Sequence, residues 1–238
     1  MNPTLRTFLA LACAWAGVVL VPANSSQAAF SLLTGGDSGD GWTAPVAPYH
    51  VVISGNILHQ VDAGPIPVVQ GVAFPAMDSV GYPTARANLT GAYQQNWSLG
   101  TNLGASANDD NLERILQSGA NPAGFYTLNL TGLIANFPYR IDLFGHTTAN
   151  NATTPNTVTV HVDGVPMDTF DEVAGAAYLV TYDVLSNGAG QIQIGIEQTL
   201  HVAPSNPMMN GFALTVLPEP SIAMVVVGCV GPVLRRRR

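Results

Sequence analysis

Glycine and proline interrupt this chain of 238 residues so often that long regular elements have few places to form. The 24 glycines and 17 prolines are scattered along the whole sequence. Glycine weakens helices and strands through its conformational entropy, and proline removes a backbone hydrogen-bond donor. Short β-branched and apolar runs bounded by turn residues lie between them. This pattern predicts an all-β domain.

Eight short runs are candidate strands, and several of them alternate apolar and polar residues. In Thr157–Val162 the valines fall on one face, and in 191–197 the isoleucines do. Such alternation fits antiparallel sheets with one face in water, and eight strands suggest a β-sandwich. Asp163-Gly164 and Asn187-Gly188 have the composition of hairpin turns. The candidate strands are 49–54, 68–74, 124–130, 139–145, 157–162, 177–182, 191–197 and 209–216.

One short helix is expected inside the domain, at 109–116. Asn108 or Asp109 is the expected cap, and the acidic residues Asp109 and Asp110 favour the positive end of the helix. Because it is short, we expect it to add little to the core.

The amino-terminal segment has the order of a secretory signal peptide. Arg6 and the free amino group supply positive charge, and an apolar run follows at 8–21. A polar stretch then ends in the small residues Ala28-Ala29. Residues 1–29 are therefore predicted to form a signal helix that signal peptidase removes after Ala28 or Ala29. A retained membrane anchor is the alternative, although the run is shorter than the ~20 residues of a comfortable span.

The carboxy-terminal 21 residues combine three features. Pro218-Glu219-Pro220 ends the preceding strand, because proline cannot donate to a ladder. An apolar stretch of 13 residues, 222–234, is short for a stable span. A basic cluster that would stay on the cytoplasmic side closes the chain. This cluster is Arg235, Arg236, Arg237 and Arg238.

The tail as a whole resembles the PEP-CTERM sorting signal. The resemblance implies that an exosortase-type membrane enzyme cuts near Pro218-Glu219-Pro220 and passes the protein to the cell surface or the extracellular polysaccharide matrix. A short hydrophobic helix would anchor the chain in the inner membrane only transiently. The apolar stretch departs from relatives in being rich in valine and in containing Pro232. An ordinary tail anchor or a disordered basic tail is the alternative.

The region between the two ends, residues 30–217, is acidic and has no cysteine. Only Glu219 of the 15 acidic residues lies outside it, and only three of the eight arginines lie inside it, so it holds 14 acids against three basic residues. This charge makes nucleic acid and anionic membrane surfaces poor partner candidates. The domain must fold without a disulfide.

Part of this domain is similar to galactose-binding-like jelly rolls. The similarity rests on a Leu-x-Gly-Leu pattern at 128–133, on the run 139–144, on the hairpin 157–164 and on a closing strand at 210–215. It implies a jelly-roll form of the sandwich and says nothing about a ligand.

Catalysis has little support in the sequence. The five histidines have no zinc-ligand spacing, and no nucleophile elbow, Walker loop or His-Glu-x-x-His motif occurs. Asp168, Asp171 and Glu172 cluster, but neighbours in one loop need not face each other. A secreted glycan-active enzyme is the alternative, and it requires two carboxylates across a cleft.

Calcium and carbohydrate are the two ligand classes that the composition favours. Calcium takes oxygen ligands from acidic loops and would stiffen a domain without disulfides. Sugars stack on aromatic faces while amides and acids bind their hydroxyls. The candidate calcium residues are Asp37, Asp40, Asp109 and Asp110, and the candidate sugar-binding residues are Trp42, Tyr93 and Trp97.

Together these features predict an exported, non-catalytic surface or matrix component. It would consist of a signal peptide (1–29), a β-sandwich (30–217) and a sorting signal (218–238), and it would bind extracellular polysaccharide or fill a structural role.

Overall fold

The structure is a computed structural model that describes residues 29–33, 42–56, 65–77, 86–91, 93–96, 103–121, 125–146, 157–172, 176–200 and 209–218. In chain order its elements are β1 (Ala29–Leu33), β2 (Val51–Asn56), β3 (Val68–Val69), β4 (Val72–Ala73), β5 (Ala87–Thr90), β6 (Tyr93–Asn96), α2 (Ala107–Leu116), β7 (Ser118–Asn121), β8 (Phe125–Leu130), β9 (Pro138–His146), β10 (Thr157–Val162), β11 (Val165–Asp171), β12 (Ala177–Leu185), β13 (Ile192–Leu200) and β14 (Gly211–Val216).

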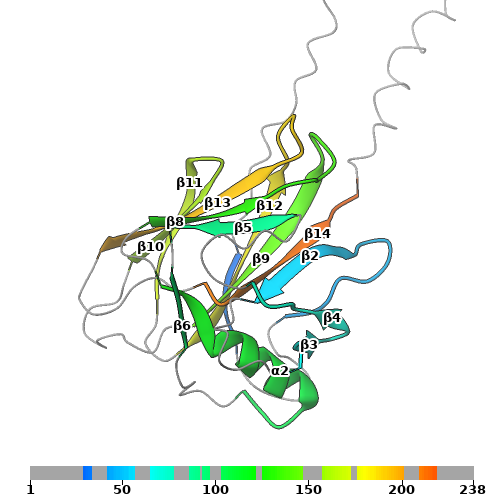
Figure 1. The fold of residues 1–238 in the computed structure, drawn as a ribbon, viewed down its shortest axis with the longest axis vertical. Coiled ribbons are helices and arrows are strands. Elements are labelled where there is room, and N and C mark those ends of the chain that lie inside the picture. Colours follow the sequence, from blue (N-terminus) through cyan, green and yellow to red (C-terminus); the bar gives the residue numbers. More distant parts are fainter. Residues whose placement is uncertain are drawn as a thin grey trace, which may run out of the picture.

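Two antiparallel sheets of five strands each form the body of the domain (Figure 1). Sheet I has the order β1-β12-β9-β14-β2, and sheet II has the order β11-β10-β13-β8-β5. There are also two small two-stranded sheets: β3-β4 is a hairpin, whereas β6 and β7 pair although helix α2 lies between them in the chain. All strand ladders are antiparallel, which confirms the predicted all-β class with antiparallel sheets.

The main core lies between the two sheets. Every second residue of the central strands points inward, as the alternation predicted. Leu128 of β8 and Ile194 of β13 meet Ile141 of β9 and Leu214 of β14 in one cluster, and all four are fully buried. Burial of a side chain of this size stabilises the fold by about 1.5–3 kcal/mol.

Aromatic side chains fill the places above two core glycines. Tyr178 lies directly opposite Gly145 in the register, and Phe212 lies opposite Gly55. A Cβ atom at Gly145 would overlap the Tyr178 ring, and one at Gly55 would come within 2.7 Å of Phe212. These glycines are therefore required by close packing rather than by backbone conformation.

A second apolar cluster covers part of the outer face of sheet I. Leu112, Ile115 and Leu116 of helix α2 are fully buried there, against Phe144 of β9 and Ala213 of β14. The expectation that the helix adds little to the core is therefore wrong, because its apolar face closes one end of the sheet.

Helix α2 begins two residues before the predicted position. Ser106 is its cap: Ser106 Oγ accepts a hydrogen bond from Asp109 N at 3.1 Å, and Ser106 N donates to Asp109 Oδ2 at 3.1 Å. This capping box corrects the prediction that Asn108 or Asp109 caps the helix, since Asp109 occupies the third helical position.

All eight predicted strands correspond to observed ones, with two kinds of difference. The run 68–74 is a tight hairpin, because Gln70 and Gly71 take φ values of 48° and 81°. Strands β1, β5, β6, β7 and β11 are not among the predicted strands, because their runs are short, polar or interrupted by proline. The Asp163-Gly164 turn is confirmed, with φ of 49° and 79° between β10 and β11.

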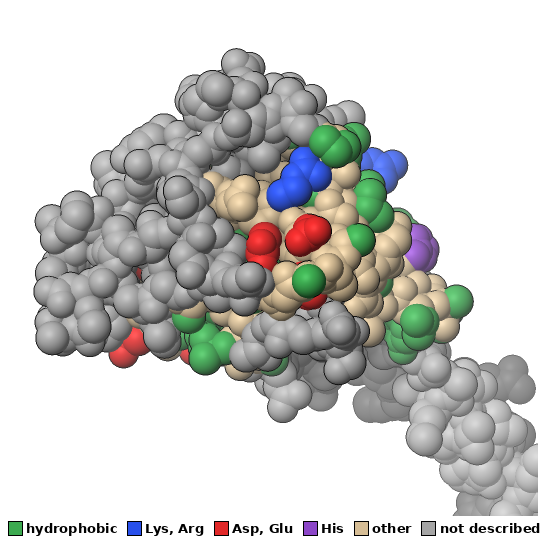
Figure 2. Space-filling view, turned by 90° about the horizontal axis from the view of Figure 1, so that it is seen from below, with side chains coloured by type: hydrophobic (Ala, Val, Ile, Leu, Met, Phe, Trp, Pro, Cys, Tyr) green, Lys and Arg blue, Asp and Glu red, His purple; other side chains and the backbone are tan. Residues whose placement is uncertain are grey.

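The predicted terminal segments, residues 1–29 and 218–238, lie outside the described residues except for Ala29, which belongs to β1 rather than to a helix, and Pro218. Within the described ranges, no helix has the length and apolarity needed to cross a bilayer. Figure 2 shows one face of the molecule, where acidic and basic side chains gather close together and hydrophobic ones are scattered around them.

Candidate functional site

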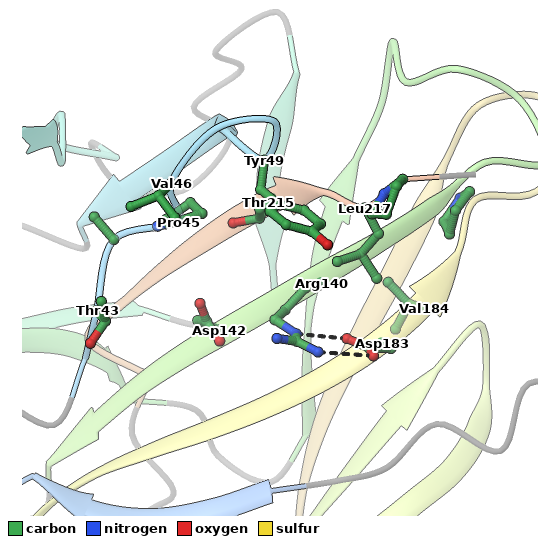
Figure 3. A pocket seen from close by; sticks show the side chains of 13 residues that line it. Thr43, Pro45, Val46, Tyr49, Arg140, Asp142, Asp183, Val184, Thr215 and Leu217 are labelled. Carbon is green, nitrogen blue, oxygen red and sulfur yellow. Dashed lines mark hydrogen bonds and ion pairs between the residues drawn. The ribbon is translucent and has the colours of Figure 1, made fainter. Parts of the chain in front are cut away.

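An open cleft of about 680 Å³ lies on the part of sheet I that helix α2 leaves uncovered. Its floor consists of Arg140 and Asp142 from β9, Asp183 from β12 and Thr215 from β14. Figure 3 shows these side chains between Pro45 and Val46 on one side and Val184 and Leu217 on the other.

The strand register brings the floor residues together. Arg140, Asp142 and Phe144 share the outer face of β9 because successive side chains alternate. Arg140 lies directly opposite Asp183, and Asp142 lies opposite Thr181. The same strand thus supplies an apolar anchor beneath helix α2 and two charged groups in the cleft.

Arg140 and Asp183 form a bidentate ion pair. Arg140 Nε donates to Asp183 Oδ1 at 2.8 Å and Nη2 donates to Oδ2 at 3.1 Å. The hydrogen bond that Arg140 donates to Asp183 raises the pKa of Arg140. Both side chains remain nearly half exposed, so the pair adds only about 0–1 kcal/mol to stability. Its main effect is to hold donors and acceptors at fixed positions in the cleft.

Asp142 lies at the boundary between the cleft and the second apolar cluster. It is 7% exposed, and it accepts hydrogen bonds from Trp42 Nε1 at 2.9 Å and from Thr181 Oγ1 at 2.7 Å. Burial raises the pKa of Asp142, while the bonds from Thr181 and Trp42 act in the opposite direction. Both oxygens of this carboxylate are therefore engaged within the protein.

The walls of the cleft are largely apolar, with one aromatic ring. Tyr49 N donates to Val46 O at 3.0 Å, which closes a turn containing the cis peptide bond Ala47-Pro48. On the other side, Leu217 N donates to Pro138 O at 3.1 Å. An exposed tyrosine, apolar walls and a charged floor together suit a ligand with both hydroxyl groups and apolar ring faces.

The structure places Trp42 beneath this cleft rather than at its surface. Trp42 is 3% exposed, and its ring packs edge-on against Phe74 and Phe144 at 5.6 Å. A sugar cannot stack on a ring that is packed in this way, so its predicted role as a sugar platform is corrected. Its observed contact is the hydrogen bond that fixes Asp142.

The other two predicted sugar-binding aromatics are not placed in the site. Tyr93 belongs to β6, but its side chain is not described, and Trp97 lies outside the described residues.

The predicted calcium residues do not come together in the described ranges. Asp109 is fully buried in the capping box, whereas Asp110 is exposed on the first turn of α2. Asp37 and Asp40 lie outside the described residues. Among the residues that the structure describes, no three acidic, histidine or cysteine side chains form a group that could hold a metal ion.

The acidic cluster near the end of β11 is dispersed. Glu172 is fully buried and accepts a hydrogen bond from Tyr178 Oη at 2.6 Å, while Asp171 accepts one from Thr157 Oγ1 at 2.7 Å. Asp168 Oδ1 accepts from Thr169 N at 2.8 Å. The three carboxylates therefore do not form one site.

The sequence reasoning missed all of the cleft residues. Tyr49, Arg140, Asp183 and Thr215 are far apart in the sequence and match no motif. One signal was available: Arg140 and Asp142 place two charges on one face of an otherwise apolar strand.

Comparisons with solved structures show a similar fold in larger proteins. The extracellular domain of ANXUR2 from Arabidopsis thaliana aligns with a TM-score of 0.53 at 10% identity, over 71% of this chain and 49% of that one. The extracellular domain of ANXUR1 from the same plant gives 0.51 at 9% identity, over 71% and 49%. The chain thus spans about half the length of these ectodomains, and at this identity the likeness concerns the fold alone.

A family 35 carbohydrate-binding module from Clostridium thermocellum also aligns, with a TM-score of 0.34 at 11% identity, over 54% of this chain and 90% of that one. This score is too low to support an argument about fold or ligand. No protein-family model and no curated protein sequence matches the chain.

Proposed function

We propose that this protein is a non-catalytic carbohydrate-binding component of an extracellular polysaccharide layer, and that its sandwich is a jelly roll. The cleft on sheet I is the observation that supports binding. It offers an exposed aromatic ring at Tyr49 and a half-exposed fork of donors and acceptors at Arg140 and Asp183. Sugar-binding sites combine these two elements, because a sugar ring has apolar faces that stack on an aromatic side chain and hydroxyl groups at its edge that form hydrogen bonds.

A polysaccharide array probed with the full chain in mild detergent tests this function. The Asp183→Asn variant removes the charged acceptor that faces the cleft and weakens the hold on Arg140. Hydrogen bonds to charged groups contribute about 1.5–3 kcal/mol, so we expect affinity to fall by about tenfold or more. Asp110→Asn, the same change on the exposed side of α2, is the matched control and should bind normally. Unaltered binding by Asp183→Asn would remove the cleft from the proposal.

A glycan-active enzyme remains the alternative because two carboxylates, Asp142 and Asp183, share the floor of this cleft. Against it, Asp142 is 7% exposed and both of its oxygens accept hydrogen bonds from the protein, whereas a glycosidase needs two carboxylates that reach the substrate. Release of reducing ends from the bound polysaccharide, lost in Asp142→Asn, would favour the enzyme over the binding protein.

We further propose export through the amino-terminal signal and exosortase-type processing at Pro218-Glu219-Pro220. The tripartite tail supports this. Intact-mass measurement of the released protein should give a first residue of Ala29 or Phe30 and a last residue within the Pro-Glu-Pro segment. A released protein that retains its arginine cluster would contradict processing.

A further inference from the structure

The outer face of sheet II carries polar side chains, of which Thr127 and Thr159 are buried, and one exposed aromatic ring. Phe125, at the start of β8, is 50% exposed. The alternation of β8 and β13 places Thr127, Asn129 and Gln193 on the same face as Phe125, while Tyr126 and Leu128 point into the core. Single exposed rings are common, so the setting of this one decides its significance.

A glycine lies beneath the Phe125 ring. A Cβ atom at Gly195 would come within 2.7 Å of Phe125 Cζ and 3.0 Å of Cε2. The His161 ring approaches the Phe125 ring edge-on, with centroids 5.7 Å apart and an interplanar angle of 79°. The phenyl ring therefore rests over the backbone of β13, and its exposed half forms a small platform.

A carboxylate adjoins this platform. Glu197 lies directly opposite Phe125 in the register, and its Oε2 is 2.8 Å from His161 Nε2. Glu197 keeps 43% of its side chain exposed, so the carboxylate is held in place and still reaches solvent. An aromatic platform beside a positioned acceptor is the arrangement that binds a sugar ring and its hydroxyls.

The face continues from the platform along β13. Gln193 Nε2 donates to Asn129 Oδ1 at 3.0 Å, and both border a polar hollow of about 490 Å³ that also includes Asp163 and Asn187. Gln193 and Glu197 are four residues apart, which is about 14 Å at strand spacing. This track is long enough for an extended chain of several sugars.

The charge of the face selects among glycans. The five strands of sheet II contain no arginine or lysine, whereas Glu197, Asp163 and Asp171 lie on or beside the face. Arg86, just before β5, is the one basic residue described beside this face, and it lies at the opposite end from Phe125. The carboxylates near Phe125 would repel an anionic polysaccharide, so a neutral one is the fitting ligand.

We propose that the outer face of sheet II, centred on Phe125 and Glu197, is a second binding surface for neutral polysaccharide, and that the domain bridges two glycan chains. This surface and the cleft on sheet I lie on opposite sides of the sandwich, because each faces away from the shared core. Bridging rests on the proposed function of the cleft, whereas binding at Phe125 does not.

Binding and precipitation measured on the full chain in mild detergent test the two parts separately. The probes are neutral galactan, mannan and β-glucan, with alginate as the anionic comparison. Phe125→Leu keeps an apolar side chain but loses the stacking ring, so its affinity for the bound neutral probe should fall about three- to tenfold. Phe125→Trp should bind at least as well as the unaltered protein. Ile134→Leu, at another exposed apolar position, is the matched control.

Precipitation of the neutral polymer distinguishes the bridge from simple binding. The unaltered chain should precipitate it, and both Phe125→Leu and Asp183→Asn should still bind but no longer precipitate it. Equal binding by Phe125→Leu and Phe125→Trp, or preference for alginate, would overturn the second surface. Loss of all binding in Asp183→Asn alone would leave the cleft as the single site, and binding lost only in Phe125→Leu would reject the cleft and retain this surface.

Discussion

The two outer faces of the sandwich are built from strands of similar length, but one is partly covered by other elements of the protein and the other carries mainly polar side chains. Sheet I carries outward apolar residues, such as Phe144, Leu179 and Ala213, which the second cluster and helix α2 cover. Sheet II carries outward threonines, amides and one exposed phenylalanine, Phe125. A strand with one face in water alternates apolar and polar residues. A strand that is covered on both faces carries apolar residues at inward and outward positions alike.

Two phenylalanines at outward positions allow this contrast to be measured. Phe144 on sheet I is fully buried, whereas Phe125 on sheet II is half exposed. Phe144→Ala should lower the free energy of unfolding by about 3–5 kcal/mol, because it opens a cavity in the second cluster. Phe125→Ala should cost about 1 kcal/mol or less. Urea unfolding followed by tryptophan fluorescence measures both, and equal losses would show that the two faces are not different.

A smaller effect on stability, which depends on pH, is expected from Asp142, at the boundary between the covered and the open part of sheet I. Burial raises the pKa of Asp142 above 3.8, so the folded protein holds this proton more tightly than the unfolded chain. The bound proton on Asp142 therefore stabilises the fold below about pH 3.8. This stabilisation is lost as the pH rises through the raised pKa of Asp142, with a slope of at most about 1.4 kcal/mol per pH unit.

The Asp142→Asn variant has no such proton to lose. Its free energy of unfolding, relative to the unaltered protein, should therefore increase as the pH is raised from about 4. Unfolding curves at several pH values test this, with the exposed Asp110→Asn as the matched change. A difference that stays constant with pH would mean that Asp142 is not buried at this boundary.

The smallest expected effect concerns the cap of the helix that covers sheet I. Ser106→Ala removes the oxygen that accepts from Asp109 N, and such changes cost about 1 kcal/mol. Gln117→Ala, an exposed position at the other end of the helix, is the control. Thermal unfolding that is identical for both variants would show that the capping box does not help to hold the cover in place.

Most of the sandwich follows from the sequence, because the strands of its core alternate or are continuously apolar. Thr157–Val162 was predicted with the bounds that the structure shows. The edge strands β1, β5 and β11 escaped prediction, since partial exposure relaxes their pattern and Pro166 interrupts β11. Helix α2 was predicted, but its contribution to the core was not, because that contribution depends on the apolar outward residues of the strands that the helix covers.

The cleft could not be predicted, because the strand register creates it. Arg140 and Asp183 meet only when β9 and β12 pair in one particular register, and Tyr49 comes from a turn far from both. Trp42 misled the prediction for a related reason: its polar neighbours in the sequence suggested exposure, whereas its neighbours in space are Phe74 and Phe144.

Strand β1 bears on the proposed removal of the signal peptide. Its five residues pair one by one with β12, from Ala29 opposite Thr181 to Leu33 opposite Ala177. A mature chain that starts at Ala29 keeps the complete ladder, and one that starts at Phe30 lacks its first rung. If the signal peptide is removed as proposed, the choice between Ala29 and Phe30 as the first residue changes the β1–β12 ladder by one residue pair.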